Sequence, residues 1–179
     1  MKNDNRGFTL VELIISIALL GIIAVAAAGF LVTGTRTYAN VNYSVRLQYE
    51  TQLAMDQIQN YVMNCGAGAA WDSGSSTLYL ISDKTYVFQY SDEKILFGSG
   101  AIAQAAPQAG DVLAEHVKGF TVSFVPATVG ETAGGAESVE ITLAMERGGK
   151  TYTGTQTLAL RNKPLAANSW SDLWKGLNP

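Results

Sequence analysis

The residue with the clearest chemistry in this chain is Glu12, an acid beside a long apolar segment. It closes the sequence Arg6-Gly7-Phe8-Thr9-Leu10-Val11-Glu12, and the uncharged run 13–32 follows at once. An ionised side chain at the centre of a bilayer costs ~2.5–3.5 kcal/mol on insertion scales, so an acid in a membrane-length segment indicates a function. The run is longer than the roughly 18 residues that indicate a membrane-spanning helix. The sequence therefore predicts a membrane anchor with a functional carboxylate near its start.

Three other types of segment compete with this interpretation of the N-terminus. In a plain signal anchor, Glu12 would only favour the positive end of the helix dipole, an effect worth ~0.3–1 kcal/mol. In a secretory signal peptide, cleavage would follow Ala26-Ala27-Ala28. The apolar region of such a peptide, however, spans roughly 7–15 residues and carries no acid. The length of the uncharged run disfavours the third type, a buried helix of a soluble protein.

Residues 6–12 resemble the processing and assembly signal of type IV pilins and the related pseudopilins. The resemblance implies that a prepilin peptidase cuts after Gly7, that the new N-terminal residue Phe8 is methylated, and that Glu12 directs subunits into a filament. It also implies a single-pass cell-membrane protein before assembly and an extracellular filament afterwards, with other pilin subunits as partners through the N-terminal helix. Lys2 and Arg6 precede the span, so the positive-inside rule places the leader in the cytoplasm and the C-terminal domain outside it.

Helical periodicity continues beyond the anchor. Apolar residues recur on one stripe at Leu47, Ala54, Ile58, Tyr61 and Cys65. This spacing is typical of an amphipathic helix. We expect one continuous helix from Phe8 to Asn64 that ends at Gly66. Two helices broken near Gly34 are the alternative.

After residue 66 the apolar period changes to two, which predicts short strands. The predicted strands are Thr77–Ile81, Thr85–Tyr90, Lys94–Phe97, Phe120–Phe124, Val139–Met145 and Thr151–Leu160. The segments 66–76, 98–110 and 127–137 have the composition of loops. Because no connection offers a crossover helix, we expect one antiparallel sheet that packs on the amphipathic half of the helix. The predicted fold class is α+β, and it resembles the pilin fold.

These elements divide the chain into five parts. They are a leader at 1–7, a transmembrane and assembly helix at 8–32, its amphipathic continuation at 33–65, an antiparallel β domain at 66–163 and a tail at 164–179. The part outside the membrane is long enough for one modest domain and too short for two. In the tail, Trp170 and Trp174 are four residues apart, as on one face of a short helix.

Three later segments narrow the resemblance. They are the helix end 47–58, the segment 112–120 and the closing residues 158–162. Together with the leader they resemble minor pilins of the PilW type and J-type pseudopilins. The resemblance implies a structural subunit, present in few copies, that acts at initiation or at the tip of the filament. The filament is a type IV pilus, a type II secretion pseudopilus or a DNA-uptake pilus.

Composition disfavours other classes of function. The net charge is −3 and no cluster of Lys and Arg is present, so we expect no direct nucleic-acid binding. Cys65 and His116 are the single cysteine and the single histidine, which leaves a zinc site short of ligands. We interpret Cys65 as a small apolar residue on a helix face and His116 as a surface or loop residue. No phosphate-binding loop or nucleophile motif is present, so we expect no enzyme, cofactor or metal.

A membrane-anchored adhesin is the rival class of function. Trp71, Trp170 and Trp174 are the candidate contacts, because exposed aromatic side chains dominate binding hot spots. Ordinary packing of the same rings is the alternative. Exposure of the three rings distinguishes the two interpretations.

Overall fold

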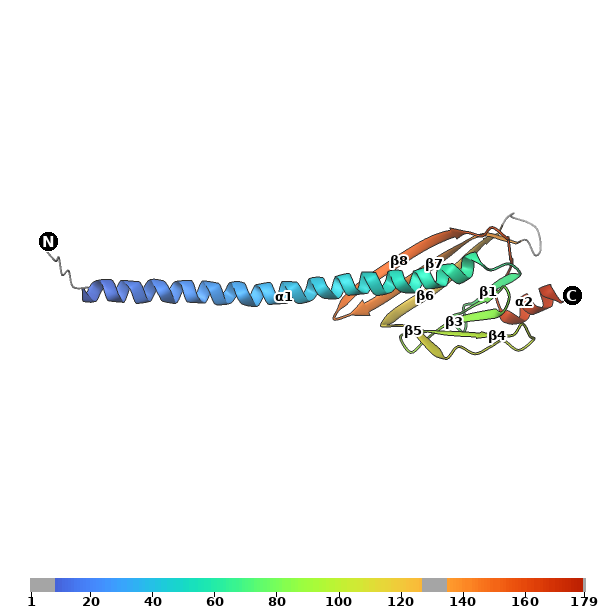
Figure 1. Ribbon diagram of the computed structural model, residues 1–179, viewed down its shortest axis with the longest axis horizontal. Helices are drawn as coiled ribbons and strands as arrows, with labels where there is room; N and C mark the ends of the chain where they lie inside the picture. Colours follow the sequence, from blue (N-terminus) through green and yellow to red (C-terminus); the bar gives the residue numbers. More distant parts are fainter. Residues whose placement is uncertain (1–8, 127–134, 179) are drawn as a thin grey trace, which may run out of the picture. The chain divides into compact units, whose positions relative to one another are not determined.

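The computed structural model describes residues 9–126 and 135–178. The chain divides into two units, Met1–Asn42 and Tyr43–Pro179. One long helix, α1 (Leu10–Met63), begins in the first unit and ends in the second (Figure 1). The second unit also holds the strands β1 (Gly68–Asp72), β2 (Thr77–Ile81), β3 (Thr85–Ser91), β4 (Lys94–Gly100), β5 (Asp111–Glu115), β6 (Val117–Pro126), β7 (Ala136–Arg147), β8 (Lys150–Ala159) and β9 (Leu165–Ala167), and the helix α2 (Trp170–Leu177).

The predicted long helix is confirmed over the described residues. α1 runs without a break through Gly34 and ends at Met63, next to the expected Asn64. The alternative of two helices broken near Gly34 is therefore wrong. The expected first residue, Phe8, lies outside the described residues.

The strands form two sheets, where the sequence predicts one. A six-stranded sheet has the order β5-β4-β3-β2-β1-β9, and a three-stranded sheet has the order β6-β7-β8. The chain passes from the first to the second at His116, whose φ of 63° lets β5 turn directly into β6. The backbone N–H of Val117 donates to Glu93 O (2.8 Å), and that of Glu146 donates to His116 O (2.8 Å). Hydrogen bonds on both sides thus hold this corner in place.

The prediction of purely antiparallel pairing is also wrong, because β1 and β9 pair in parallel. The other pairs of named strands are antiparallel. A parallel pair needs a long crossover connection. Here the strands between β1 and β9 supply the crossover, in place of the helix whose absence led to the antiparallel prediction.

The predicted loop at 66–76 contains β1, which pairs with β2 along its whole length. Ala69 and Ala70 of this strand are buried, and a Cβ added at Gly68 would lie 2.7 Å from Leu173 Cδ1 of α2. Gly and Ala have weak strand propensity. The narrow space beside α2, rather than an alternating sequence pattern, makes this segment a strand.

The second half of α1 packs on the β structure through one face. Its buried residues are Leu47, Thr51, Ala54, Met55, Ile58 and Val62. All but Thr51 share one hydrophobic core with the buried residues Val139, Ile141, Leu143 and Met145 of β7. Glu140, between them, is exposed, so the predicted alternation of β7 is confirmed. The result is an α+β arrangement of a long helix on antiparallel-rich sheet, as the sequence predicts.

We expect Leu143→Ala to lower the free energy of unfolding by ~2–5 kcal/mol, because a fully buried aliphatic side chain is lost. The matched exposed change Glu140→Ala should stay within about 0.5 kcal/mol of the wild type. Urea unfolding of the full chain in detergent, followed by tryptophan fluorescence, measures both. A larger loss for Glu140→Ala would show that the strand faces are reversed.

Candidate functional site

Reciprocal hydrogen bonds between Thr9 and Glu12 close the first turn of α1. Thr9 Oγ1 accepts from the backbone N–H of Glu12 (3.2 Å). Glu12 Oε2 accepts from the backbone N–H of Thr9 (3.2 Å) and from the Thr9 hydroxyl (3.0 Å). This is a capping box, in which each side chain satisfies a backbone donor that has no partner within the helix. Glu12 therefore shapes the helix start in addition to carrying a charge.

The segment after Glu12 pairs its few hydroxyls within the helix. Ser16 donates to Glu12 O (2.7 Å), and Thr33 donates to Gly29 O (2.9 Å). The most apolar 18-residue window of α1 has a mean hydropathy of 2.7 and lies near the N-terminus. α1 is thus long and apolar enough to cross a membrane. Its backbone N–H and C=O groups are hydrogen-bonded within the helix, as they must be in hydrocarbon, where no water is present to pair with them. Gly7 and Phe8, the predicted cleavage and methylation site, lie outside the described residues.

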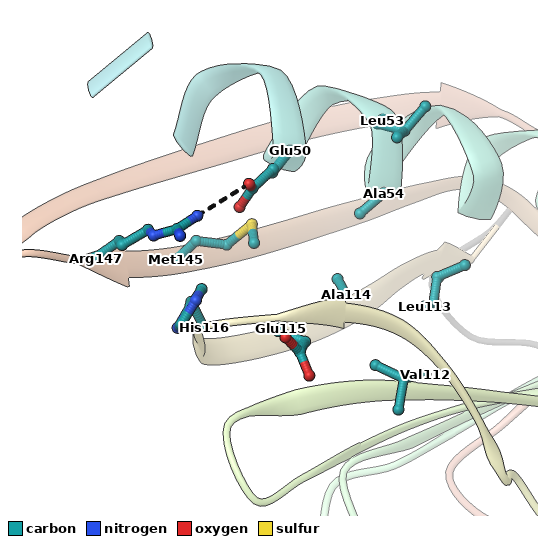
Figure 2. Close-up of a pocket in the computed structure, with 10 residues that line it drawn as sticks. All are labelled: Glu50, Leu53, Ala54, Val112, Leu113, Ala114, Glu115, His116, Met145 and Arg147. Carbon is teal, nitrogen blue, oxygen red and sulfur yellow. Dashed lines mark hydrogen bonds and ion pairs between the residues drawn. The ribbon is translucent and has the colours of Figure 1, made fainter. Parts of the chain in front are cut away.

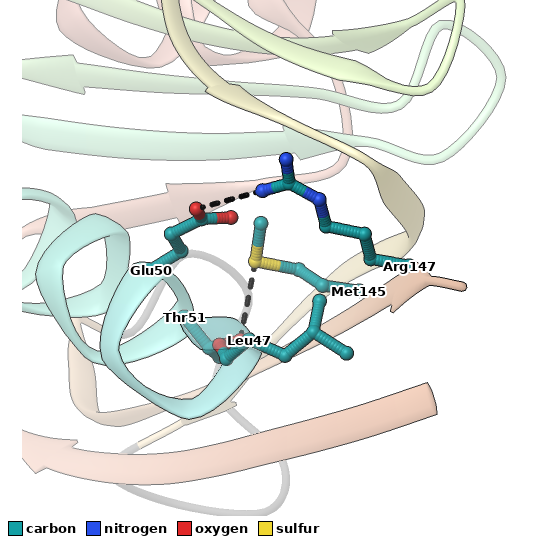
Figure 3. A network of polar contacts seen from close by, with 5 residues as sticks. All are labelled: Leu47, Glu50, Thr51, Met145 and Arg147. Carbon is teal, nitrogen blue, oxygen red and sulfur yellow. Dashed lines mark hydrogen bonds and ion pairs between the residues drawn. The ribbon is translucent and has the colours of Figure 1, made fainter. Parts of the chain in front are cut away.

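In the second unit, a small network joins α1 to β7 (Figure 3). Thr51 Oγ1 donates to Leu47 O (2.7 Å) and lies 3.1 Å from Met145 Sδ. Beside it, Arg147 Nη1 lies 3.3 Å from Glu50 Oε1. The side chains of this ion pair are 34% and 37% exposed, so the pair is worth only ~0–1 kcal/mol. The pair links one turn of α1 to the end of β7, while the shared apolar core supplies most of the contact between them.

A pocket of about 340 Å³ lies between α1, β5 and the end of β7 (Figure 2). It is lined by Glu50, Leu53, Ala54, Val112, Leu113, Ala114, Glu115, His116, Met145 and Arg147. Both carboxylates are already paired, Glu50 with Arg147 and Glu115 with Lys94 (3.1 Å). His116 is exposed, as predicted. The described residues of the lining offer no hydroxyl or thiol nucleophile beside a base.

The described side chains also give no support for a metal site. In residues 9–126 and 135–178, no group of three or more His, Cys, Asp or Glu could hold a metal ion. Asp92 and Glu93 form the turn between β3 and β4, with φ of 51° and 58°. Glu93 lies 2.7 Å from Lys118 Nζ, and this ion pair lowers the pKa of the Glu93 carboxyl. These acids are turn and surface charges.

The comparison with protein families concerns the N-terminal segment. A family model described as the prokaryotic N-terminal methylation motif matches residues 2–28. This match supports a type IV pilin-like subunit. It implies processing by a prepilin peptidase and association with the membrane and with other pilins, and it points to a structural subunit rather than an enzyme. No curated protein matches the chain.

The three tryptophans considered as adhesive contacts are half-buried. The ring of Trp71 meets Phe120 edge-on, with centroids 5.4 Å apart. Trp170 packs against Tyr79 at 5.3 Å and against Trp174 at 6.2 Å, and the last two tryptophans lie on α2 as predicted. Rings engaged in this way contribute packing. The packing interpretation is therefore favoured over the adhesive one.

Two kinds of contact were not predicted from the sequence. Thr9 as the partner of Glu12 had a signal, because Thr-x-x-Glu before an apolar run is the capping-box pattern. No sequence signal pointed to the side-chain pairs that join α1 to the sheet. Gln156 Nε2 donates to Gln59 Oε1 (2.8 Å) across 97 residues of sequence, and no local pattern predicts such a pairing.

Cys65 lies just beyond the end of α1, and not on its face as predicted, because the helix stops at Met63. Its side chain is 2% exposed, and its Sγ lies 3.1 Å from Gly68 O. Burial raises the pKa of the Cys65 thiol. The reactive thiolate is thus both scarce at neutral pH and shielded from solvent.

We expect Cys65 to react with a thiol reagent such as Ellman's reagent only after unfolding. The measurement compares the rate of thiol release from the native full chain in detergent with the rate in urea. Rapid reaction of the native protein would contradict the burial of this side chain.

Proposed function

We propose that this chain is a minor pilin or pseudopilin, a structural subunit that is cut between Gly7 and Phe8, methylated at Phe8 and inserted into a filament through α1. The match of residues 2–28 to the methylation motif carries this proposal. The described geometry supports it, since α1 joins an apolar anchor to a half that packs on a β domain. The filament is a type IV pilus or a type II secretion-like pseudopilus. The minor role rests on the resemblance of segments 47–58, 112–120 and 158–162.

We propose five parts for this subunit, of which the methylation motif covers only residues 2–28. The leader 1–7 is removed, residues 8–32 anchor the precursor in the membrane, and 33–65 connect the anchor to the β domain. The β domain 66–163 and the tail 164–179 lie outside the cytoplasm. After assembly the anchor exchanges lipid for the N-terminal helices of other subunits.

We propose that Glu12 guides assembly by pairing with the N-terminal amine of a neighbouring subunit. Cleavage leaves Phe8 with a positive amine beside an apolar helix, and Glu12 carries the opposite charge. Pairing relieves two desolvated charges at once, and loss of one partner of a buried pair typically costs ~3–5 kcal/mol. The capping box supports this role, because Glu12 Oε2 takes both hydrogen bonds from Thr9. Within the described residues, Oε1 accepts none, so it is available to an incoming amine.

Processing is tested by N-terminal mass spectrometry of the mature protein. The sequence should begin at methylated Phe8. A bulky charged residue in place of Gly7 should block cleavage and leave the precursor in the membrane. A start at Gly29 would instead support a secretory signal peptide, and an uncut Met1 a plain anchor.

Three substitutions separate the charge of Glu12 from its capping role. Glu12→Ala removes both, Glu12→Gln removes the charge but keeps an oxygen that accepts from Thr9, and Thr9→Ala removes the capping partner but keeps the charge. The readout is the ratio of the subunit in sheared filaments to that in membranes. If charge pairing drives assembly, Glu12→Gln should lower the ratio nearly as much as Glu12→Ala, and Thr9→Ala should change it little.

The control for this experiment is cleavage at Gly7, which all three variants should retain. If the ratio falls as far in Thr9→Ala as in Glu12→Ala, helix capping rather than charge pairing would be the role of Glu12 in assembly. An unchanged ratio in Glu12→Ala would overturn the pairing mechanism.

A further inference from the structure

Among the residues that the structure describes, strand β8 lies at an edge of the three-stranded sheet and pairs only with β7 (Figure 1). The backbone N–H of Leu160 donates to Glu137 O (2.8 Å), and the β7–β8 register extends this pairing without a shift. In an antiparallel pair, alternate residues point their N–H and C=O toward the partner. The even-numbered residues of β8 therefore bond to β7. The odd-numbered ones, Thr151, Thr153, Thr155 and Thr157, direct their backbone groups outward, and all four are exposed.

The other sheet edges carry features that prevent pairing with another chain, and β8 does not. β9 has three residues, β5 has five and a register shift against β4, and β6 has two register shifts against β7. β8 has ten residues and no charge or proline from Thr151 to Ala159. Short length, bulges, charges and proline are the usual protection of edge strands. Their absence from β8 leaves a row of hydrogen-bonding groups open to an added strand.

A pocket beside this edge can favour one type of side chain on the added strand. A pocket of about 490 Å³ is lined by β8 residues, including Gly154, and by Gln52, Met55 and Asp56 of α1. Gly154 lies against Thr51, where an added Cβ would be 3.1 Å from Thr51 Cγ2. It contributes no side chain that would fill the pocket. Across residues 9–126 and 135–178, Asp56 forms no ion pair with a Lys or Arg. A strand added at β8 would place the residue opposite Gly154 on the α1 side of the sheet.

We propose that the β8 edge binds an extended strand of a different protein, antiparallel to β8, with a lysine or arginine opposite Gly154 that reaches Asp56. Backbone hydrogen bonds to the four threonines supply the affinity, and the acid in the pocket supplies the selection. A second copy is disfavoured as the occupant. Antiparallel pairing of two β8 strands about a twofold axis reverses the second α1, and two copies anchored in one membrane keep α1 in the same direction. That exclusion rests on the proposed membrane anchoring.

The peptide Thr-Val-Thr-Lys-Thr-Val-Thr, blocked at both ends and fluorescently labelled, is the probe for this edge. Its threonines match the outward threonines of β8, and its lysine falls opposite Gly154. The control peptide has Glu in place of Lys. Fluorescence anisotropy with the purified full chain in detergent should show saturable binding, about tenfold or more tighter for the lysine peptide. This measurement needs neither cleavage nor filaments, so its failure is separate from failure of the proposed function.

Two variants locate the binding site. Thr153→Pro removes an outward N–H and leaves the β7–β8 ladder intact. It should weaken binding about tenfold or more, whereas Thr153→Val should stay within about twofold. Asp56→Asn, on the exposed side of α1, should bring the lysine peptide down to the affinity of the glutamate peptide.

Three results would overturn the proposal. They are no saturable binding of the lysine peptide, equal binding to wild type and Thr153→Pro, or a lysine preference that survives in Asp56→Asn. Self-association in analytical ultracentrifugation that Thr153→Pro abolishes would assign the edge to a second copy, which also overturns it.

Discussion

The structure depends on a single helix whose backbone hydrogen bonds are made within the chain from Leu10 to Met63. In hydrocarbon, each unpaired N–H or C=O costs several kcal/mol, so a segment that enters a membrane has to be helical. The same helical hydrogen bonding continues into the half of α1 that packs on β structure, where the helix has to bury side chains against the sheet. There the helix needs an apolar face, and Leu47, Ile58 and Val62 provide it. One element thus meets two environments with two different side-chain patterns.

The start of this helix combines two uses of one side chain. Glu12 completes a capping box with Thr9, and it places a negative charge at the positive end of the helix dipole. Both effects favour an ordered first turn. An ordered turn fixes where the carboxylate lies relative to the new N-terminus, which a frayed end would not. The capping role therefore supports the proposed pairing role rather than competing with it.

The β domain packs closely on the second half of α1. Gly154 allows β8 to approach Thr51, and the Thr51 hydroxyl donates to Leu47 O while it contacts Met145. The chain leaves one sheet for the other at the corner around His116, and this gives the domain two sheets with separate edges. Three of those edges are short or irregular. The regular one, β8, runs beside the polar side of α1, where glutamines and Asp56 line the adjacent pocket.

The sequence by itself determined the features that depend on local pattern. The uncharged run predicts the anchor, and the acid near its start predicts the role of Glu12. Helical periodicity predicts the long helix, and the change to a period of two predicts most strands. Each of these signals depends only on residues close together in the sequence. Tertiary structure decided what neighbouring residues do not encode. The small residues of β1 fit a space that is narrow on both faces, because Gly68 and Ala70 lie against α2 and Ala69 is buried in the main core. Its parallel partner β9 comes from the far end of the chain. The open β8 edge is likewise a property of strand order, which depends on pairing between residues far apart in sequence. No single segment carries that information.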